Sequence, residues 1–306
     1  MCGVTPVILD EARPDELRTR CSAVPTPRRP PLSAKPTVLY VTDLAYEARG
    51  RRYCDEDIFL SSRLREDFTV ALAHPRDALA LADGFDVVVV RNSGPVARHR
   101  AEWEAFREHA LRTGTRVFNS LKGRGDMNGK QYLADLSAEG YPVIPTADRA
   151  GDLDRLPQVA EYVVKPRFGA DSEGIRFVDR AALASADLGD VLVQPKVDFR
   201  YEVSFYFVGQ EFQYALYAPH PERRWEMDWY EPDEADMAFA RRFVEWNSVE
   251  HGVQRVDACR TDSDELLLVE LEDLNPYLSL DALDDRTRET FTAAFVRAVQ
   301  HLLASS

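Results

Sequence analysis

The residues with the clearest chemical potential lie near the C-terminal end of the chain, in two short segments. Arg255 and Asp257 alternate in the first segment, and Glu270 and Glu272 alternate in the second. Apolar runs flank the turn-forming residues 261–264, which predicts two antiparallel strands joined by a short loop. Because strand side chains alternate between faces, each pair shares one face of its strand. If the two faces coincide, three carboxylates and one guanidinium meet on the same sheet surface.

This acidic cluster indicates a metal site. So much negative charge is costly to gather unless a cation is present. Hard oxygen ligands without a nearby histidine or thiolate suit Mg²⁺, which is commonly held by one or two carboxylates and phosphate oxygens. The alternative is a solvated edge hairpin with ordinary surface acids, and that interpretation fits the loop acids Asp262, Asp264 and Glu265. It explains poorly why Asn275 and Pro276 follow at once and lead into another apolar stretch.

A second candidate site lies in the middle of the chain. Residues 161–166 read as a strand that carries Lys165 near its end, and a further strand follows after a short loop. That loop contains Gly169, Ser172 and Gly174. A mobile glycine-bearing hairpin offers backbone N–H groups and the serine hydroxyl to phosphate oxygens, while the lysine supplies a point charge. The segment therefore predicts a phosphate-binding loop.

The glycine-bearing stretch LKGRGDMNGK, which ends in Lys130, does not match either common phosphate motif. A Walker A loop needs glycine at the position of Arg124 and serine or threonine at that of Gln131. The dinucleotide-binding fingerprint needs a third glycine where Asn128 stands. What remains is a predicted helix over about residues 127–137 with Lys130 in its first turns. Taken alone, such a lysine is more often a solvated surface residue than a ligand.

Strands and helices alternate between residues 37 and 118, which predicts a small parallel α/β lobe. Ligands usually bind beyond the carboxyl ends of such strands. Arg91, Asn92 and Ser93 follow the most apolar strand, and they are candidates for orienting a carboxylate-bearing substrate. A structural role in the loop is an equally good interpretation. The expected strands cover residues 37–41, 68–73, 86–90 and 115–118, and the expected helices cover residues 55–66 and the stretch from Trp103 to a stop at Gly114.

Composition excludes several classes of protein. The chain has 306 residues and a formal charge of −14, which argues against a nucleic-acid binder because phosphate backbones are held by basic surfaces. Four cysteines without a CxxC pair predict free thiols rather than disulfides or a zinc knuckle. Apolar runs are too short to span a bilayer and the N-terminus lacks a signal-peptide core, so we expect a cytoplasmic protein. The six histidines are scattered without an HExxH pair, and each is interpreted as structural or surface.

The order of these segments resembles the ATP-grasp superfamily, whose members include carboxylate–amine and carboxylate–thiol ligases. The resemblance covers roughly residues 37–303, and the joint order and spacing are specific where no single segment is. It implies an α/β (α+β) fold, in which a parallel α/β lobe is followed by two antiparallel lobes that clamp ATP. The matching segments are Lys130 before Gly140-Tyr-Pro-Val-Ile-Pro-Thr146, Val163-Val-Lys165-Pro166 before the glycine loop, Leu192-Val-Gln194 before Glu202, and Arg255-x-Asp257 before Glu270-x-Glu272-x-x-Asn275-Pro276.

The resemblance also implies domain limits, ATP and Mg²⁺ as cofactors, and a role for each motif residue. The expected parts are a flexible proline-rich extension (1–36), an N-terminal α/β domain (37–125), a central ATP-binding lobe (126–196) and a C-terminal lobe with the metal site (197–306). The resemblance implies phosphate binding by Lys130, by Lys165 and by the loop from Gly169 through Ser172 to Gly174. It implies that adenine binds at a hinge formed by Gln194, Pro195, Lys196 and Val197, and that Glu202 binds the ribose. It further implies Mg²⁺ binding by Asp257, Glu270 and either Glu272 or Asn275, and a catalytic role for Arg255 and Lys165.

This chain departs from the superfamily pattern at two places. Glutamate is commoner at the hinge than Gln194, although adenine is recognised there largely through the main chain. The metal strand more often ends Glu-x-Asn, whereas Glu272 stands at that position here and an asparagine appears only at Asn275. The identity of the third metal ligand is therefore left open.

Three function classes follow from this resemblance. The first is an ATP-dependent ligase that activates a small-molecule carboxylate as an acyl phosphate and captures it with an amine-type nucleophile. The second is a small-molecule kinase, and the third is a nucleotide-binding module without turnover, which the joint retention of Lys165, Arg255, Asp257, Glu270 and Glu272 disfavours. Within the ligases, residues 255–259 and 269–280 resemble small-molecule biosynthetic enzymes, including cyclo-ligases of the kind that form D-cycloserine, an antibiotic. The expected partner is a small-molecule carboxylate or amine substrate, without nucleic acid or membrane, and a homodimer is the expected assembly.

Overall fold

The computed structural model describes residues 35–48, 51–91, 98–169, 174–184, 188–220, 223–224 and 226–305. All that follows belongs to the compact unit Lys35–Ser306. The predicted N-terminal extension therefore lies outside the described residues, except for its last two positions. Within the described ranges, no helix is both long and apolar enough to cross a membrane.

The first part of this unit is the predicted parallel sheet. Its order is β4-β1-β5-β6, and all three pairings are parallel, which confirms the prediction from alternating strands and helices. A small antiparallel pair and three helices complete this part. The bounds are β1 (Thr37–Val41), β2 (Glu47–Ala48), β3 (Arg51–Arg52), α1 (Tyr53–Leu64), β4 (Thr69–Ala73), α2 (Ala78–Leu81), β5 (Val87–Val90), α3 (Arg100–Thr113) and β6 (Val117–Phe118).

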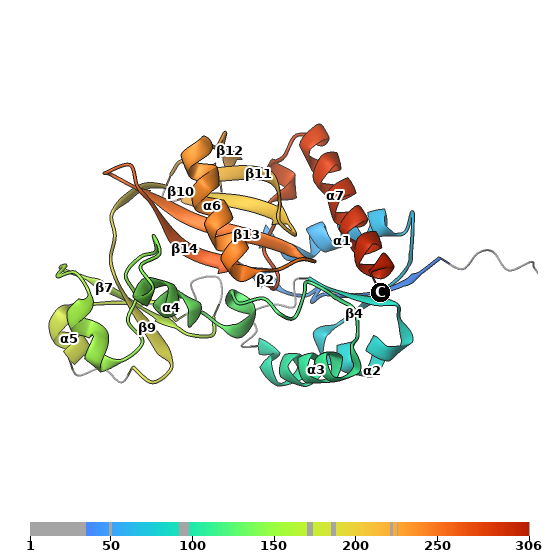
Figure 1. Cartoon of the computed structure of the whole chain (residues 1–306), viewed down its shortest axis with the longest axis horizontal. Coiled ribbons are helices and arrows are strands. Elements are labelled where there is room, and N and C mark those ends of the chain that lie inside the picture. The colour runs from blue at the N-terminus through green and yellow to red at the C-terminus, as the bar shows by residue number, and fades with distance from the viewer. Residues whose placement is uncertain are drawn as a thin grey trace, which may run out of the picture. The chain divides into compact units, whose positions relative to one another are not determined.

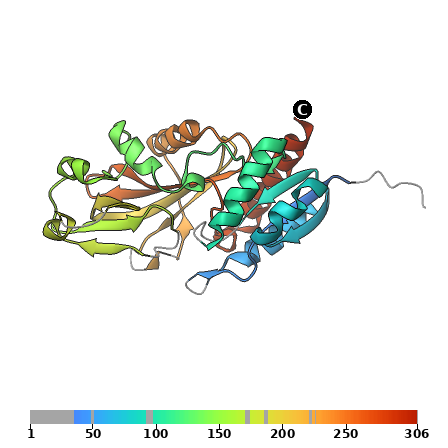
Figure 2. The same cartoon turned by 90° about the horizontal axis from the view of Figure 1, so that it is seen from below.

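Strand β5 is four valines in a row, and all four are buried. Side chains alternate along a strand, so its two faces enter different cores. Val87 and Val89 belong to a core that also holds residues of α1 and of the C-terminal helix, while Val88 and Val90 belong to a second core with Trp103 of α3. Helices thus cover both faces of the sheet, as expected for parallel strands, and Figure 2 shows α3 lying alongside it.

The predicted end of one helix is confirmed, and the predicted start of another is wrong. Helix α3 stops at Gly114, which adopts the left-handed conformation (φ 73°) as predicted. The helix expected over residues 127–137 is shorter, because α4 spans only Tyr132–Ala138. The backbone at Gly129 has φ 83°, which helical residues do not adopt, so Lys130 precedes the helix and does not belong to its first turns.

The central sheet has three antiparallel strands in the order β8-β7-β9. Its own core includes Tyr162 and Val164 of β7, Val193 of β9 and Leu183 of the short helix beside them. This confirms the expected change from parallel to antiparallel pairing in the middle of the chain. The bounds are β7 (Tyr162–Pro166), β8 (Arg176–Val178), α5 (Arg180–Ala184) and β9 (Val191–Pro195).

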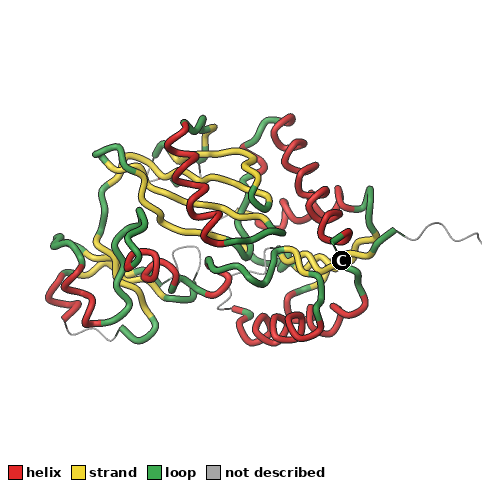
Figure 3. Tube along the Cα trace, in the orientation of Figure 1, coloured by secondary structure: helices red, strands yellow, loops and turns green. Residues whose placement is uncertain are grey.

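The C-terminal sheet has five antiparallel strands in the order β12-β11-β10-β13-β14. Helix α6 lies over one face of this sheet, and Figures 1 and 3 show it crossing the strands. The hairpin predicted around residues 261–264 is present as the antiparallel pair β13–β14, and Gly209 (φ 57°) turns a second hairpin, β10–β11. The bounds are β10 (Phe199–Val208), β11 (Glu211–Ala218), β12 (Asp228–Trp229), α6 (Glu234–Asn247), β13 (Val253–Thr261), β14 (Leu266–Glu272) and α7 (Asp285–Ala304).

Three connections fasten these sheets to one another. The buried Asn119 side chain donates to the carbonyl oxygens of Val253 (2.8 Å) and Asp273 (2.7 Å). Residues 143–147 bridge β14 and β9 through single pairings. Helix α4 packs in the core of the C-terminal sheet, with Leu133 and Leu136 fully buried there. The domain limits at residues 125 and 196 remain predictions. Helix α4 belongs to the predicted central lobe by sequence, but its buried side chains lie in the core of the C-terminal sheet.

Candidate active site

A cavity of about 360 Å³ is lined by strands of both antiparallel sheets. β7 and β9 contribute from the central sheet, and β10 and β14 from the C-terminal sheet. This volume lies within the range of small-molecule sites. Predicted site residues that line the cavity are Lys130, Lys165, Gly169, Gln194, Pro195, Lys196, Val197, Glu202 and Glu270.

Apolar side chains form much of the rest of the lining, and sequence reasoning missed them as site residues. A slot with apolar walls suits a flat aromatic ring, since burying that ring removes apolar surface from water. Each of these residues fits the ordinary alternation of a strand or a loop, so its type gave no signal. The residues are Ile144, Val163, Ile175, Phe177, Phe199 and Val269, and Phe177 is 59% exposed although it is a large apolar side chain.

Two buried lysines meet at this cavity. Lys130 is 7% exposed and Lys165 is 9% exposed. Burial lowers the pKa of Lys165 to about 7, and the nearby charges of Lys130 and Arg224 act in the same direction. The backbone N–H of Lys130 donates to the Arg167 carbonyl oxygen (2.8 Å), which seats it against the end of β7. Two cations held close together in a dry site favour a bound anion such as a phosphate.

Gly129 allows the backbone of Lys130 to lie against Arg167 at the end of β7. A Cβ atom there would lie 2.6 Å from the ring of Phe168, nearer than real Cβ contacts come. Its positive φ adds a second reason for glycine. The glycine therefore serves to place the neighbouring Lys130 against the loop that begins at Arg167.

The two predicted faces of the C-terminal hairpin do coincide. The β13–β14 register pairs Arg255 with Glu272 and Asp257 with Glu270. The Arg255 guanidinium donates to Asp257 at 2.8 to 3.1 Å, to Glu272 at 2.6 Å and to the Tyr277 carbonyl oxygen at 2.7 Å. Burial disfavours its charge, but the carboxylates of Asp257 and Glu272 outweigh burial and raise the pKa of Arg255. The guanidinium is thus a fixed cation within an acidic surface.

The remaining contacts test whether these carboxylates suit Mg²⁺. Glu270 forms an ion pair with Lys130, and the Ser204 hydroxyl donates to Asp257 (2.6 Å). Burial raises the pKa of the Glu272 carboxyl to about 8, against the opposite effect of Arg255. These are hard oxygen donors on adjacent strands, and such donors fit Mg²⁺.

The third metal ligand remains a prediction. Asn275 is half-buried and lies three residues beyond the end of β14. Glu272 lies directly on the hairpin face but is engaged by Arg255.

The predicted hinge is an extended segment at the end of β9. Gln194 pairs with Val163, and its side chain donates to the Thr146 hydroxyl (2.8 Å). The Lys196 ammonium pairs with Glu161 at 2.7 Å. Because these side chains are engaged with the protein, a base bound here would be recognised chiefly by backbone groups, as expected from the sequence.

Glu202 has a partner that sequence reasoning missed. The Arg224 guanidinium donates two parallel hydrogen bonds to its carboxylate, both of 2.7 Å. Burial raises the pKa of Glu202, while Arg224 acts in the opposite direction. Nothing in the sequence around Arg224 marked it, because 22 residues separate the two partners. The pair lines the cavity beside Lys165.

The predicted substrate residues divide into two groups. Arg91 is fully buried, and its guanidinium nitrogens lie 3.7 Å from Glu56 and 3.6 Å from Asp57. This supports the structural interpretation, since no part of the side chain is open to a substrate. Asn92 and Ser93 lie outside the described residues, as does Ser172 of the glycine loop. Of that loop, Gly169 lines the cavity and Gly174 has φ 76°.

Two further carboxylates, Asp126 and Asp273, anchor the segment that leads to Lys130. Fully buried Asp273 accepts backbone N–H groups of Gly125 (2.8 Å) and Met127 (2.9 Å). Asp126 in turn accepts the N–H of Asp273 (2.7 Å). Burial and the neighbouring Asp273 raise the pKa of Asp126 to about 7. Gly123 and Gly125 of this stretch thus accommodate a carboxylate of the chain itself.

Comparisons with known proteins agree with this architecture. No family model matches the chain. The cycloserine biosynthesis protein DcsG of Streptomyces lavendulae is 32% identical over 133 residues, which cover 37% of this chain and 44% of that protein. The match therefore spans less than half of the length of this relative.

Solved structures show a more extensive likeness. D-cycloserine synthetase DcsG is similar with a TM-score of 0.67 and 24% identity, over 87% of this chain and 99% of that one. D-alanine–D-alanine ligase from Bacillus anthracis, solved with ATP, gives a TM-score of 0.60 at 11% identity, covering 88% and 97%. The ATP-grasp ligase PsnB gives 0.59 at 13% identity, covering 87% and 99%. At these identities the likeness shows the fold.

Proposed function

We propose that this chain, which has the ATP-grasp fold, is an ATP-dependent ligase that activates a small-molecule carboxylate as an acyl phosphate and joins it to an amine-type nucleophile. One observation carries the proposal. Two buried lysines, Lys130 and Lys165, line one cavity with Glu270, and the strand register pairs Glu270 with Asp257 and the neighbouring Glu272 with Arg255. The fold shared with carbon–nitrogen ligases supports the same conclusion.

The cofactor roles follow from the lining of the cavity. The two lysines would bind the phosphates of ATP, the backbone of residues 194–197 would hold the adenine, and Glu202 would hold the ribose. Asp257 and Glu270, with Glu272 or Asn275, would hold Mg²⁺. When bound, Mg²⁺ would neutralise phosphate charge and act as a Lewis acid on the phosphoryl group.

Arg255 would address the main electrostatic obstacle of the reaction. A substrate carboxylate and a triphosphate must approach although both are anions. Hydrogen bonds to Asp257, Glu272 and the Tyr277 carbonyl oxygen hold the guanidinium in one orientation. A cation fixed in advance stabilises developing negative charge without having to reorganise. The proposed reaction requires no side-chain nucleophile.

The finer proposal concerns the substrate. The likeness to the cycloserine biosynthesis protein supports an intramolecular reaction, in which one amino-acid derivative carries both the carboxylate and the nucleophile. The product would then be a ring, formed with loss of one water from a single substrate. Product masses separate this from the joining of two molecules. A cytoplasmic location and a homodimer remain predictions.

The decisive experiment follows the oxygen atoms. If an acyl phosphate forms, the carboxylate attacks the γ-phosphorus, and the phosphate later leaves with a carboxylate oxygen. Substrate labelled with ¹⁸O in its carboxylate should therefore yield ADP and labelled inorganic phosphate in step with product. A kinase would instead keep the phosphoryl group on its product, and an adenylating enzyme would release AMP and pyrophosphate. Release of AMP, or of phosphate that never carries the label, would overturn the proposal.

A further inference from the structure

Three potential metal ligands gather outside the cavity, at the carboxyl edge of the parallel sheet. Asp43, His74 and His99 each place one ligand atom within 4.8 Å of the others. Asp43 lies two residues after β1, His74 directly follows β4, and His99 directly precedes α3. The sequence suggested scattered histidines, yet the rings of His74 and His99 have centroids 4.9 Å apart. Parallel strands end at one edge, which explains how distant positions meet there.

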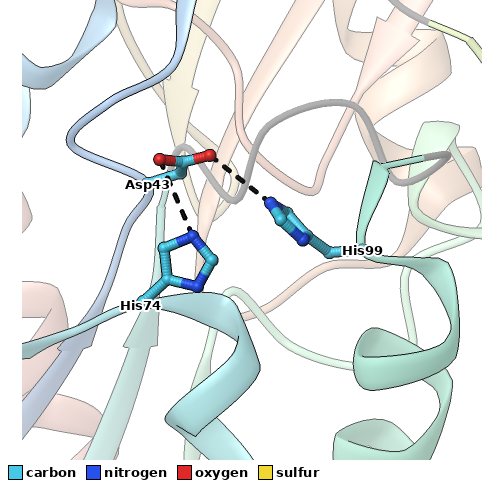
Figure 4. Close-up of side chains that lie close together, drawn as sticks. All are labelled: Asp43, His74 and His99. Atoms are coloured by element: carbon cyan, nitrogen blue, oxygen red, sulfur yellow. Dashed lines mark hydrogen bonds and ion pairs between the residues drawn. The ribbon is translucent and has the colours of Figure 1, made fainter.

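The geometry within this cluster suits a shared ion. Both histidines direct Nε2 at the Asp43 carboxylate, one toward each oxygen (Figure 4). His99 Nε2 lies 3.4 Å from Oδ2, and His74 Nε2 lies 3.8 Å from Oδ1. Both separations exceed the usual 2.7–3.2 Å of a hydrogen bond. Ligand atoms bound tetrahedrally to zinc at about 2.0–2.1 Å are about 3.4 Å apart, so an ion between them accounts better for the spacing.

Burial and access support the same interpretation. The His99 side chain is 9% exposed, so burial holds its imidazole beside the Asp43 carboxylate. The His74 side chain is 36% exposed, which leaves a route for an ion from solvent. The Ala45 N–H donates to Asp43 Oδ1 (3.0 Å) and so orients the carboxylate. An oriented carboxylate beside two imidazoles is a typical arrangement of zinc ligands.

One existing contact opposes the ion. His74 Nδ1 accepts the Arg76 backbone N–H at 3.2 Å, so that nitrogen carries no proton. Ligation through Nε2 would put the proton on Nδ1 and break this bond. The bond is long and exposed, and its loss is small beside the gain of a metal–imidazole bond.

We propose that Asp43, His74 and His99 bind a divalent first-row metal ion that prefers imidazole ligands, such as zinc. Three protein ligands leave at least one coordination position open. The ion would fasten the start of α3 to the ends of β1 and β4. This matters for the cavity, because Arg100, the first residue of α3, stacks 4.0 Å above the ring of Phe168, next to Gly169. The site does not depend on the proposed ligase activity.

Cobalt(II) is a suitable probe because it takes the same ligands and absorbs visible light. The full chain, freed of metal with a chelator, would be titrated with Co²⁺ in excess Mg²⁺, which occupies sites built from oxygen ligands. We expect one equivalent of Co²⁺ to bind with the strong visible absorption of a four- or five-coordinate site, and Zn²⁺ to displace it. Absence of stoichiometric Co²⁺ binding would overturn the proposal.

Variants locate the ion. His99→Gln and His74→Gln should each weaken Co²⁺ binding by at least about 10-fold, since even loss of an outer partner costs 10–100-fold. The matched control is His109→Gln on the same helix, where the imidazole pairs with exposed Asp83 (2.7 Å) and binding should not change. Glu270→Gln should also leave the signal intact. Loss of the signal in Glu270→Gln, or its persistence in both His99→Gln and His74→Gln, would contradict the assignment, and far-ultraviolet circular dichroism would confirm that each variant folds.

Discussion

At the scale of single residues, Lys165 shows how burial prepares a side chain for a ligand. Burial lowers its pKa to about 7, whereas an unfolded chain releases this proton near pH 10.4. Between these values the unfolded chain binds more protons than the folded one, so this group's contribution to stability becomes more favourable as pH rises. Below about pH 7 its full penalty is present. A phosphate would remove that penalty by pairing with the charge.

Changing Lys165 to Met keeps most of the stem packing and deletes the charge. We expect the nucleotide-free variant to be more stable at pH 7 by about 1 kcal/mol or more, because one pKa unit corresponds to about 1.4 kcal/mol. That gain should shrink toward pH 10.5, as measured by urea unfolding. Calorimetry should show weaker ATP binding, whereas Lys122→Met, at an exposed position, should change neither property. Unchanged ATP binding would remove Lys165 from the phosphate site.

Glu270 is the second residue whose role can be isolated. Glu270→Gln removes a hard anionic ligand but keeps the shape of the side chain, so the fold should persist. Because a metal supplies several kcal/mol of transition-state stabilisation, turnover measured as ADP release should fall roughly 100-fold or more. Glu265→Gln, in the exposed loop of the same hairpin, is the matched control and should retain activity. Near-normal turnover of Glu270→Gln would exclude Glu270 as a metal ligand.

At the scale of elements, the buried carboxylate of Asp273 binds the backbone of the segment before α4. Asp273 accepts two backbone N–H groups from this segment and approaches Gly123 closely. A Cβ at Gly123 would lie 2.2 Å from the Asp273 carboxylate oxygen. The glycine is therefore required by packing against the chain's own acid, and the position of Lys130 depends on that packing.

Gly123→Ala should consequently destabilise the protein by about 1–3 kcal/mol, the usual effect of overpacking. Gly151→Ala is the matched control, because a Cβ there meets no atom of the described residues within 4 Å. That change should be neutral or stabilise by about 0.4–1 kcal/mol through the unfolded state. Midpoints of urea unfolding compare the two variants, and equal midpoints would contradict the packing argument.

At the scale of the whole described unit, α7 joins two sheets. Phe295 is fully buried and meets Phe118 of β6 edge-to-face at 5.3 Å between ring centroids. Phe291 packs in the same way on Tyr214 of β11 at 5.6 Å. The parallel sheet and the five-stranded sheet therefore share one core, while the central sheet has its own.

Phe295→Ala should leave a cavity in the core that the two sheets share. We expect a loss of about 3–5 kcal/mol, typical of a deleted core phenylalanine. Hydrogen exchange followed by mass spectrometry should show faster exchange in β1 and β10 together, with a smaller change in β7 and β9. Faster exchange confined to the parallel sheet would show that the two sheets do not unfold together.

The sequence by itself determined the local elements and their faces. The alternation in residues 253–272 placed Arg255 and Asp257 on one face of a hairpin, and the register then paired them with Glu272 and Glu270. The strand that carries Lys165 was also predictable. These features depend on neighbours a few residues away, which periodicity records. A local error came at Gly129, where a positive φ displaced the start of a helix.

Only the tertiary structure decided which faces oppose one another. The sequence shows that Ile144 and Val269 are apolar, but it does not show that both line the same cavity. The packing of separate sheets brings them together there. Packing of distant segments also brings Arg224 to Glu202 and His74 to His99. The role of Arg91 could not be assigned from its loop, because its buried partners Glu56 and Asp57 lie on α1. Contacts between distant positions depend on how elements pack, and a pattern of local neighbours carries no information about that packing.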